Sequence, residues 1–143
     1  PEYVTIDEVK RVCVALGIRD WTQLAAPQVD LEEARVVYEA LDVKELQIEI
    51  EDFRQGLEVE LEHGTMFSEY NVTNNHPLLT GKIVLAHFKE LPDYYKRLDV
   101  AEIEGDLLKA LLANNSAKLE KLLLKLSKAR VALSQDEAAR LAG

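Results

Sequence analysis

Apolar residues recur every three or four positions through most of this chain, which is the interval of a helix that buries one face. The spacing predicts helices over residues 6–16, 31–41, 51–63, 77–90, 92–113 and 117–132. Capping boxes, in which a Ser, Thr or Asp and a Glu three residues later satisfy each other's backbone N–H groups, begin at Thr5, Asp30 and Ser134. The box at Ser134 predicts a separate short helix near the end of the sequence.

Glycine, proline and asparagine mark where the helices are expected to end. Gly17 and Gly64 each follow an apolar stripe and are expected to terminate it. Residues 65–76 are expected to form a loop, because their Asn and Thr side chains favour turns, and Pro77 suits the first position of the next helix. Ser116, which follows two asparagines, is expected to cap the helix after it.

One segment fits two structures. Between residues 44 and 50, Leu46, Ile48 and Ile50 alternate with polar residues, as in a strand. Leu46 and Ile50 also continue the apolar stripe of the helix that follows. Residues 44–50 therefore either join that helix or run extended.

The composition favours an all-α fold. The chain has 143 residues, of which 48% are hydrophobic and only a few are Gly or Pro. These values predict a small irregular helical bundle over residues 1–113, followed by a helical extension over residues 114–143. The single cysteine, Cys13, lies on an apolar stripe, so we expect a small buried residue rather than a reactive thiol.

The charge of the chain restricts its partners. The formal net charge is −9, and the whole excess lies in residues 1–98, which carry 19 acidic and 10 basic residues. A nucleic-acid backbone requires a positive face, so direct binding to DNA or RNA is not expected, whereas a basic protein partner is permitted. No apolar run approaches the roughly 20 residues that span a bilayer, and no signal peptide opens the sequence, so we expect a cytoplasmic protein that does not bind membranes.

Two short blocks carry the same pair of side chains in opposite order. Glu60 precedes His63 by three residues, and His87 precedes Glu90 by three residues. At about 100° per residue, the four side chains point towards the apolar faces of their helices, with His63 at an edge. We expect antiparallel helices in which Glu60 pairs with His87 and His63 with Glu90, because an unpaired buried carboxylate is costly.

The same four side chains leave two chemical alternatives open. Carboxylate and imidazole groups can bind Fe, Mn or Zn, but ferritin-like sites combine two Glu-x-x-His motifs with two further glutamates, and here one motif is reversed. General acid–base catalysis is the other alternative. The sequence has no phosphate-binding loop or nucleophile motif, so it assigns no catalytic residue, cofactor or reaction.

The 117–132 helix combines a leucine stripe with a basic face. The stripe consists of Leu119, Leu122, Leu123, Leu126 and Leu133, and the basic residues are Lys118, Lys121, Lys125, Lys128 and Arg130. We expect the leucines to pack within the same domain and the basic side chains to be solvated. Docking of this helix on a partner protein is the alternative.

The sequences EDFRQGLEVELEHG, NVTNNHPLLTGKIVLAH and LPDYYKRL together resemble a small uncharacterised helical domain of phages and bacteria. The resemblance covers residues 3–19 and 51–98, so that 20–50 resembles an insertion and 99–143 an extension. The residues that recur in that domain correspond here to Glu62, His63, Gly64, Asn71, Thr73, His87 and Glu90. The resemblance implies a fold and a phage or bacterial origin, and it implies no activity.

These observations favour a non-catalytic protein that binds another protein. It would dock on a larger machine through its acidic N-terminal part and its C-terminal helices, and a host RNA polymerase is the example that the phage resemblance suggests. A virion assembly or connector protein is equally compatible. The competing class is a metalloprotein that uses Glu60, His63, His87 and Glu90.

Overall fold

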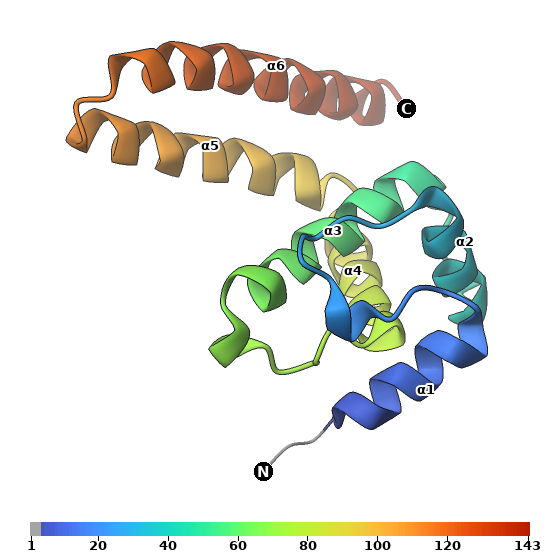
Figure 1. Ribbon diagram of the computed structural model, residues 1–143. Helices are drawn as coiled ribbons and strands as arrows, with labels where there is room; N and C mark the ends of the chain where they lie inside the picture. The colour runs from blue at the N-terminus through green and yellow to red at the C-terminus, as the bar shows by residue number, and fades with distance from the viewer. Residues whose placement is uncertain (1–3) are drawn as a thin grey trace. The chain divides into compact units, whose positions relative to one another are not determined.

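The computed structural model describes residues 4–143, which contain α-helices and short 3₁₀ helices and no strand (Figure 1). This confirms the all-α prediction; the first three residues of the expected core domain lie outside the described part. In chain order the elements are α1 (Ile6–Leu16), η1 (Trp21–Gln23), α2 (Leu31–Ala40), α3 (Ile50–Met66), η2 (Ser68–Tyr70), α4 (Pro77–Glu90), α5 (Tyr94–Leu112) and α6 (Ser116–Leu141).

The chain divides into two compact units, residues 1–89 and residues 90–143. The sequence had suggested a division near residues 114–116. These residues instead join α5 to α6, which lie side by side as an antiparallel hairpin (Figure 1). Asn114 makes this turn with a φ of 52°, a left-handed conformation that asparagine tolerates.

The capping signals place the first helices where the sequence predicts them. The Thr5 hydroxyl accepts a hydrogen bond from the backbone N–H of Glu8 at 3.2 Å, and Gly17 ends α1 with a φ of 69°. The reciprocal half of this capping box is replaced by an ion pair, because the Glu8 carboxylate lies 2.6 Å from Arg11. Asp20 caps η1, because its side chain accepts a hydrogen bond from the backbone N–H of Thr22 at 3.0 Å.

The stretch 20–50 contributes core residues to the first unit. Its buried apolar residues are Trp21, Val29, Ala34 and Val37. Tyr38 packs edge-on against Phe53 of α3 with ring centroids 5.2 Å apart. Cys13 is buried as predicted, and burial raises the pKa of its thiol.

A buried acid, Glu33, holds this stretch together. Its carboxylate forms an ion pair with the Arg19 guanidinium at 2.7 Å and accepts a hydrogen bond from the backbone N–H of Asp30 at 3.1 Å. The second contact is one of the two hydrogen bonds of the predicted capping box. Burial alone would raise the pKa of Glu33, but the hydrogen bonds from Arg19 and from the backbone lower it below its ordinary value. The acid therefore stays charged inside the unit and ties the segment before η1 to α2.

Residues 44–49 lie in neither a helix nor a strand, and Glu49, which is extended, precedes the start of α3 at Ile50. Phe53, Leu57 and Leu61 are buried along one stripe of α3, as their spacing predicts. The prediction that Gly64 ends this helix is wrong, because α3 continues to Met66. Gly64 instead lies where another part of the chain approaches the helix closely.

The second unit has its core between α5 and α6. Its buried residues are Ile103, Ala110, Leu122 and Leu126, with Leu119 and Ala129 partly buried beside them. The leucine stripe is thus confirmed at Leu119, Leu122 and Leu126, whereas Leu123 is exposed and Leu133 is half-buried. The break expected before Ser134 is wrong, because α6 is continuous to Leu141, and its cap is Asn115 rather than Ser116.

Asp93 explains why α6 continues. Its side chain is fully buried at the start of α5, where it accepts hydrogen bonds from Arg97 at 2.8 Å and from Arg140, near the end of α6, at 2.9 Å. Lys96 likewise pairs with Asp136. The hydrogen bond from Arg97 holds the pKa of Asp93 below its usual range, so the carboxylate is charged at neutral pH. These contacts hold the last turns of α6 against α5.

None of the helices within residues 4–143 is both long enough and apolar enough to cross a membrane.

Candidate functional site

A pocket of about 410 Å³ in the first unit brings together most of the residues that the sequence motifs singled out. Its walls come from the end of α3, from η2 and the loop after it, and from α4. The lining residues are Glu60, His63, Gly64, Phe67, Tyr70, Asn71, Val72, Thr73, Thr80 and Ile83. The pocket therefore combines one carboxylate and one imidazole with several apolar side chains.

One half of the predicted clasp is present. Nε2 of His87 lies 3.5 Å from Oε1 of Glu60, and the two side chains are 29% and 18% exposed. The contact joins α3 to α4, as expected for neighbouring helices, and it restrains the carboxylate in the pocket.

The other two residues do not have the predicted environment. His63 and Glu90 are both exposed, so the prediction that they point inwards is wrong. His63 lies at the edge of the apolar stripe of α3. At this edge, a small rotation of the helix about its axis is enough to turn a side chain from the core to solvent. His63 lines the pocket, whereas Glu90 is the last residue of α4 and is not among the lining residues.

The pocket rests on a packed junction between α3 and the loop before α4. The Asn71 amide donates to Oδ1 of Asn75 at 3.0 Å, and the Asn75 amide donates to the backbone carbonyl of Trp21 at 3.0 Å. A Cβ atom on Gly64 would lie 2.4 Å from Oδ1 of Asn75 and 2.7 Å from the Asn71 amide nitrogen. Gly64 is thus required for close approach rather than for a helix end.

The third histidine, His76, is a structural residue that the sequence analysis did not identify. It is buried, and its Nδ1 atom accepts hydrogen bonds from the backbone N–H groups of Leu78 at 3.2 Å and Leu79 at 3.3 Å. Burial lowers the pKa of His76, which favours the neutral ring that this role needs. Its position directly before Pro77 was the available signal, because a residue there caps the first turn.

Large apolar side chains surround the opening of the pocket. Four large side chains that line the pocket are nevertheless exposed, those of Phe67, Tyr70, Val72 and Ile83. Met66, the last residue of α3, is exposed next to Phe67. Soluble proteins rarely leave such a contiguous apolar surface uncovered unless it binds something.

The side chains of the described residues are not grouped as a metal site would need. Within residues 4–143, no group of three or more His, Cys, Asp and Glu side chains is arranged to hold a metal ion. Glu60 and His87 together supply two ligands, whereas a zinc site takes three or four from the protein.

The basic residues of α6 are placed as the sequence predicts. Lys118, Lys121, Lys125 and Lys128 are exposed, and the leucines on another side of the helix pack against α5. Arg130 is also exposed and lies 3.8 Å from Glu104 of α5.

The chain belongs to the family DUF5661, described as a protein of unknown function, whose model matches residues 9–104. The match agrees with the resemblance to an uncharacterised domain, and it runs across residues 20–50 and over the whole pocket. No curated protein and no solved structure matches the chain.

Proposed function

We propose that the first unit is a non-catalytic protein-recognition module whose pocket holds a basic side chain of a partner protein. The observation that carries the proposal is the Glu60 carboxylate, which lies in the pocket at 18% exposure among largely apolar neighbours. A partly desolvated carboxylate attracts a cation more strongly than one in bulk water, because the local dielectric is lower.

The apolar rim fits the rest of such a side chain. Arg and Lys carry an aliphatic stem that can lie along Ile83 and Val72 while the charged end reaches Glu60. The rings of Phe67 and Tyr70 offer further contacts to a cation or to an apolar neighbour in the partner.

The charge of the unit supports the same partner. Residues 1–89 carry 17 acidic and 8 basic residues, so the net charge of the whole chain is concentrated there. Such a field accelerates the approach of a basic segment and disfavours an acidic one. The contact with His87 adds preorganisation, because a restrained carboxylate loses less entropy when it binds a cation.

Selection of displayed random peptides against the full chain tests this function. Binders are expected to share an Arg or Lys flanked by apolar residues. Glu60→Gln keeps the shape of the side chain and removes its charge. It is expected to weaken the selected peptides by about tenfold, which is the value of a charge-assisted hydrogen bond in a partly buried site.

A matched pair of surface variants locates the binding face. Val72 and Val14 are 83% and 80% exposed, so Val72→Ser and Val14→Ser should both leave the fold unchanged. Only Val72→Ser, beside the pocket, should weaken binding. Selected peptides that lack a basic residue, or that bind Glu60→Gln as well as the natural chain, would contradict the proposal.

The resemblance to a phage and bacterial domain adds a proposal about the partner's identity. A basic, accessible segment of a host machine such as RNA polymerase would suit this pocket. Retention of purified bacterial RNA polymerase by the immobilised chain, lost in Val72→Ser and kept in Val14→Ser, would support this partner. Absence of retention would refute it without bearing on the peptide result.

A further inference from the structure

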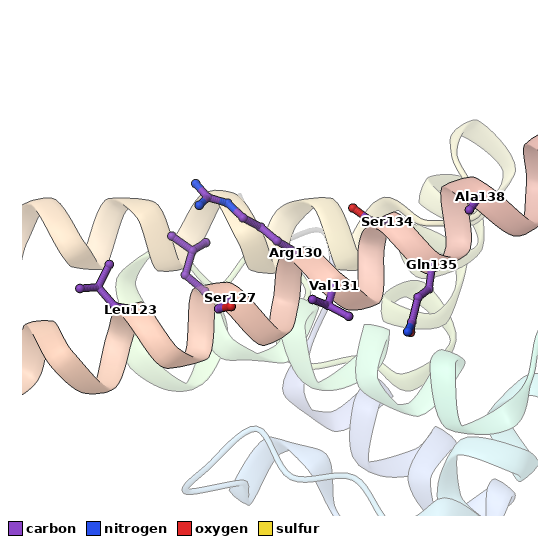
Figure 2. Close-up of a pocket in the computed structure, with 8 residues that line it drawn as sticks. Leu123, Ser127, Arg130, Val131, Ser134, Gln135 and Ala138 are labelled. Atoms are coloured by element: carbon purple, nitrogen blue, oxygen red, sulfur yellow. The ribbon is translucent and has the colours of Figure 1, made fainter.

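α6 has a second stripe, made of large apolar and small residues, that its packing against α5 does not use. The stripe, called here the outer stripe, consists of Leu124, Ser127, Val131, Ser134, Ala138 and Leu141. All six residues are exposed, among them Leu124 at 60% and Val131 at 53%. Ser127, Val131, Ser134 and Ala138 also line a shallow hollow along this helix (Figure 2).

The outer stripe has the same spacing in both directions. The intervals between successive members are 3, 4, 3, 4 and 3 residues, which is the seam of a coiled coil and is symmetric about the midpoint between Val131 and Ser134. A helix face with this symmetry is complementary to itself when two copies are antiparallel, and a two-fold axis then passes through the midpoint.

We propose that the outer stripe is a dimer interface at which α6 packs antiparallel against α6 of a second copy of this chain. The position of the two-fold axis alone determines which residues of the two helices face each other. It places Leu124 opposite Leu141 of the second copy, Ser127 opposite Ala138, and Val131 opposite Ser134.

The side-chain sizes suit this register. The bulky leucines meet at the two ends of the interface, and the small serines and alanines lie between them. Small residues at the centre let the helix axes approach to the short end of the usual 8–10 Å range, and Val131 on each helix fills the space over Ser134 of the other.

Charged residues on one edge of the outer stripe are complementary in the same register. Arg130 and Glu137 lie on this edge, and the two-fold axis brings Arg130 of each copy close to Glu137 of the other. Within the chain these two residues pair with Glu104 and Arg97, each at a separation of 3.8 Å. These pairs are exposed and therefore weak, so they can be shared with the second copy.

The other edge is also compatible with a second copy. There the axis brings Lys128 near Gln135 of the other helix, and no lysine faces a lysine. Of the remaining lysines of α6, Lys118 and Lys125 project from the opposite side of the helix. Lys121, seven residues before Lys128, lies on the same edge, and the axis brings it near Ala142 of the other copy. Like charges therefore do not oppose the association.

The mass of the full chain in solution tests the proposal. Sedimentation or light scattering is expected to give twice the 16.1 kDa of one chain. Val131→Asp places two buried charges near the axis and should raise the dissociation constant at least a hundredfold, giving a monomer with unchanged helical content. Lys125→Asp, on the opposite side of α6, should remain dimeric. A monomeric natural chain, or a dimer that Val131→Asp leaves intact, would overturn the proposal.

Charge reversal tests the register. Arg130→Glu and Glu137→Arg should each weaken the dimer several-fold, and the double variant should restore it, because each copy then offers the same pair in reverse. This register would be excluded if the double variant lost as much dimer stability as the two single variants lose together.

Disulfide formation tests the antiparallel direction. When Leu124→Cys protein is mixed with Leu141→Cys protein under oxidising conditions, the cross-link is expected between the two variants and not within either one. In the antiparallel register, residue 124 and its copy are about 25 Å apart along the helix, since each residue adds about 1.5 Å. Cys13 is buried and does not compete. Self-cross-linking of Leu124→Cys alone would indicate parallel helices and refute the proposed arrangement.

Discussion

Gly64 and Gly105 both lie inside helices, and replacement of each by alanine should have opposite effects. In an isolated helix, Gly→Ala is favourable by about 1 kcal/mol. At Gly105, no atom lies within 4 Å of the added Cβ, so this gain should be realised in full. At Gly64, the added Cβ would lie 2.4 Å from Oδ1 of Asn75, which is far inside van der Waals contact.

Asn75 cannot move away without loss. Its amide donates to the carbonyl of Trp21 at 3.0 Å, its Oδ1 accepts from Asn71 at 3.0 Å, and the residue is buried. Overpacking of this kind costs about 1–3 kcal/mol, and each hydrogen bond that breaks adds about 1 kcal/mol. After subtraction of the helix gain, Gly64→Ala should lower the free energy of unfolding by about 1–3 kcal/mol.

Urea denaturation measures both variants. The fluorescence of Trp21, the single tryptophan, reports the unfolding of the first unit, and circular dichroism reports both units. The reasoning would be refuted if Gly64→Ala stabilised the protein as much as Gly105→Ala does. Asn75→Ala combined with Gly64→Ala serves as a check, because removal of the clashing amide should make the two effects less than additive.

Three further predictions follow from buried groups. The pKa of His76 is lowered by burial, so its stabilising effect is complete above its unfolded pKa and is lost as the pH falls through the folded value. In His76→Asn the side chain can still cap the helix but does not titrate. The free energy of unfolding, measured by urea denaturation, should therefore change less between about pH 8 and pH 5 than it does in the natural chain. Asp93→Ala should lower the free energy of unfolding by about 1–3 kcal/mol, nearer the lower value because Arg97 and Arg140 are half exposed and can be rehydrated, and thermal denaturation checks this. Cys13 should react with a thiol reagent only at the rate of unfolding, since burial raises its pKa, and rapid labelling of the native chain would contradict this.

The sequence predicts features whose cause is local. Thr5, Asp20 and Pro77 determine helix starts through hydrogen bonds or backbone angles that involve only the next few residues. The stripe of Phe53, Leu57 and Leu61 is likewise fixed by helical spacing alone. The pairing of Glu60 with His87 could be expected because both helices needed a partner for a polar group on an apolar face.

The predictions that fail depend on distant parts of the chain. Gly64 has the local signature of a helix end, but the approach of Asn75 decides its role. Ser134 opens a capping box, yet Arg140 reaches Asp93 and Asp136 reaches Lys96, so packing on α5 outweighs the local alternative. The role of His76 is local but has a weak sequence signal, because histidine is not among the residues that usually cap a helix.

The family match separates the two proposals along the chain. The pocket and the residues that support it, from Glu60 to His87, lie within the matched stretch 9–104, whereas the outer stripe begins at Leu124, beyond it. The stretch that defines the family thus contains the proposed pocket and does not contain the outer stripe. If both properties hold, each dimer carries two pockets, and a partner that presents repeated basic segments would bind with an avidity above that of a single site. Val131→Asp should then weaken capture of a repeated segment and leave the affinity for a single peptide unchanged.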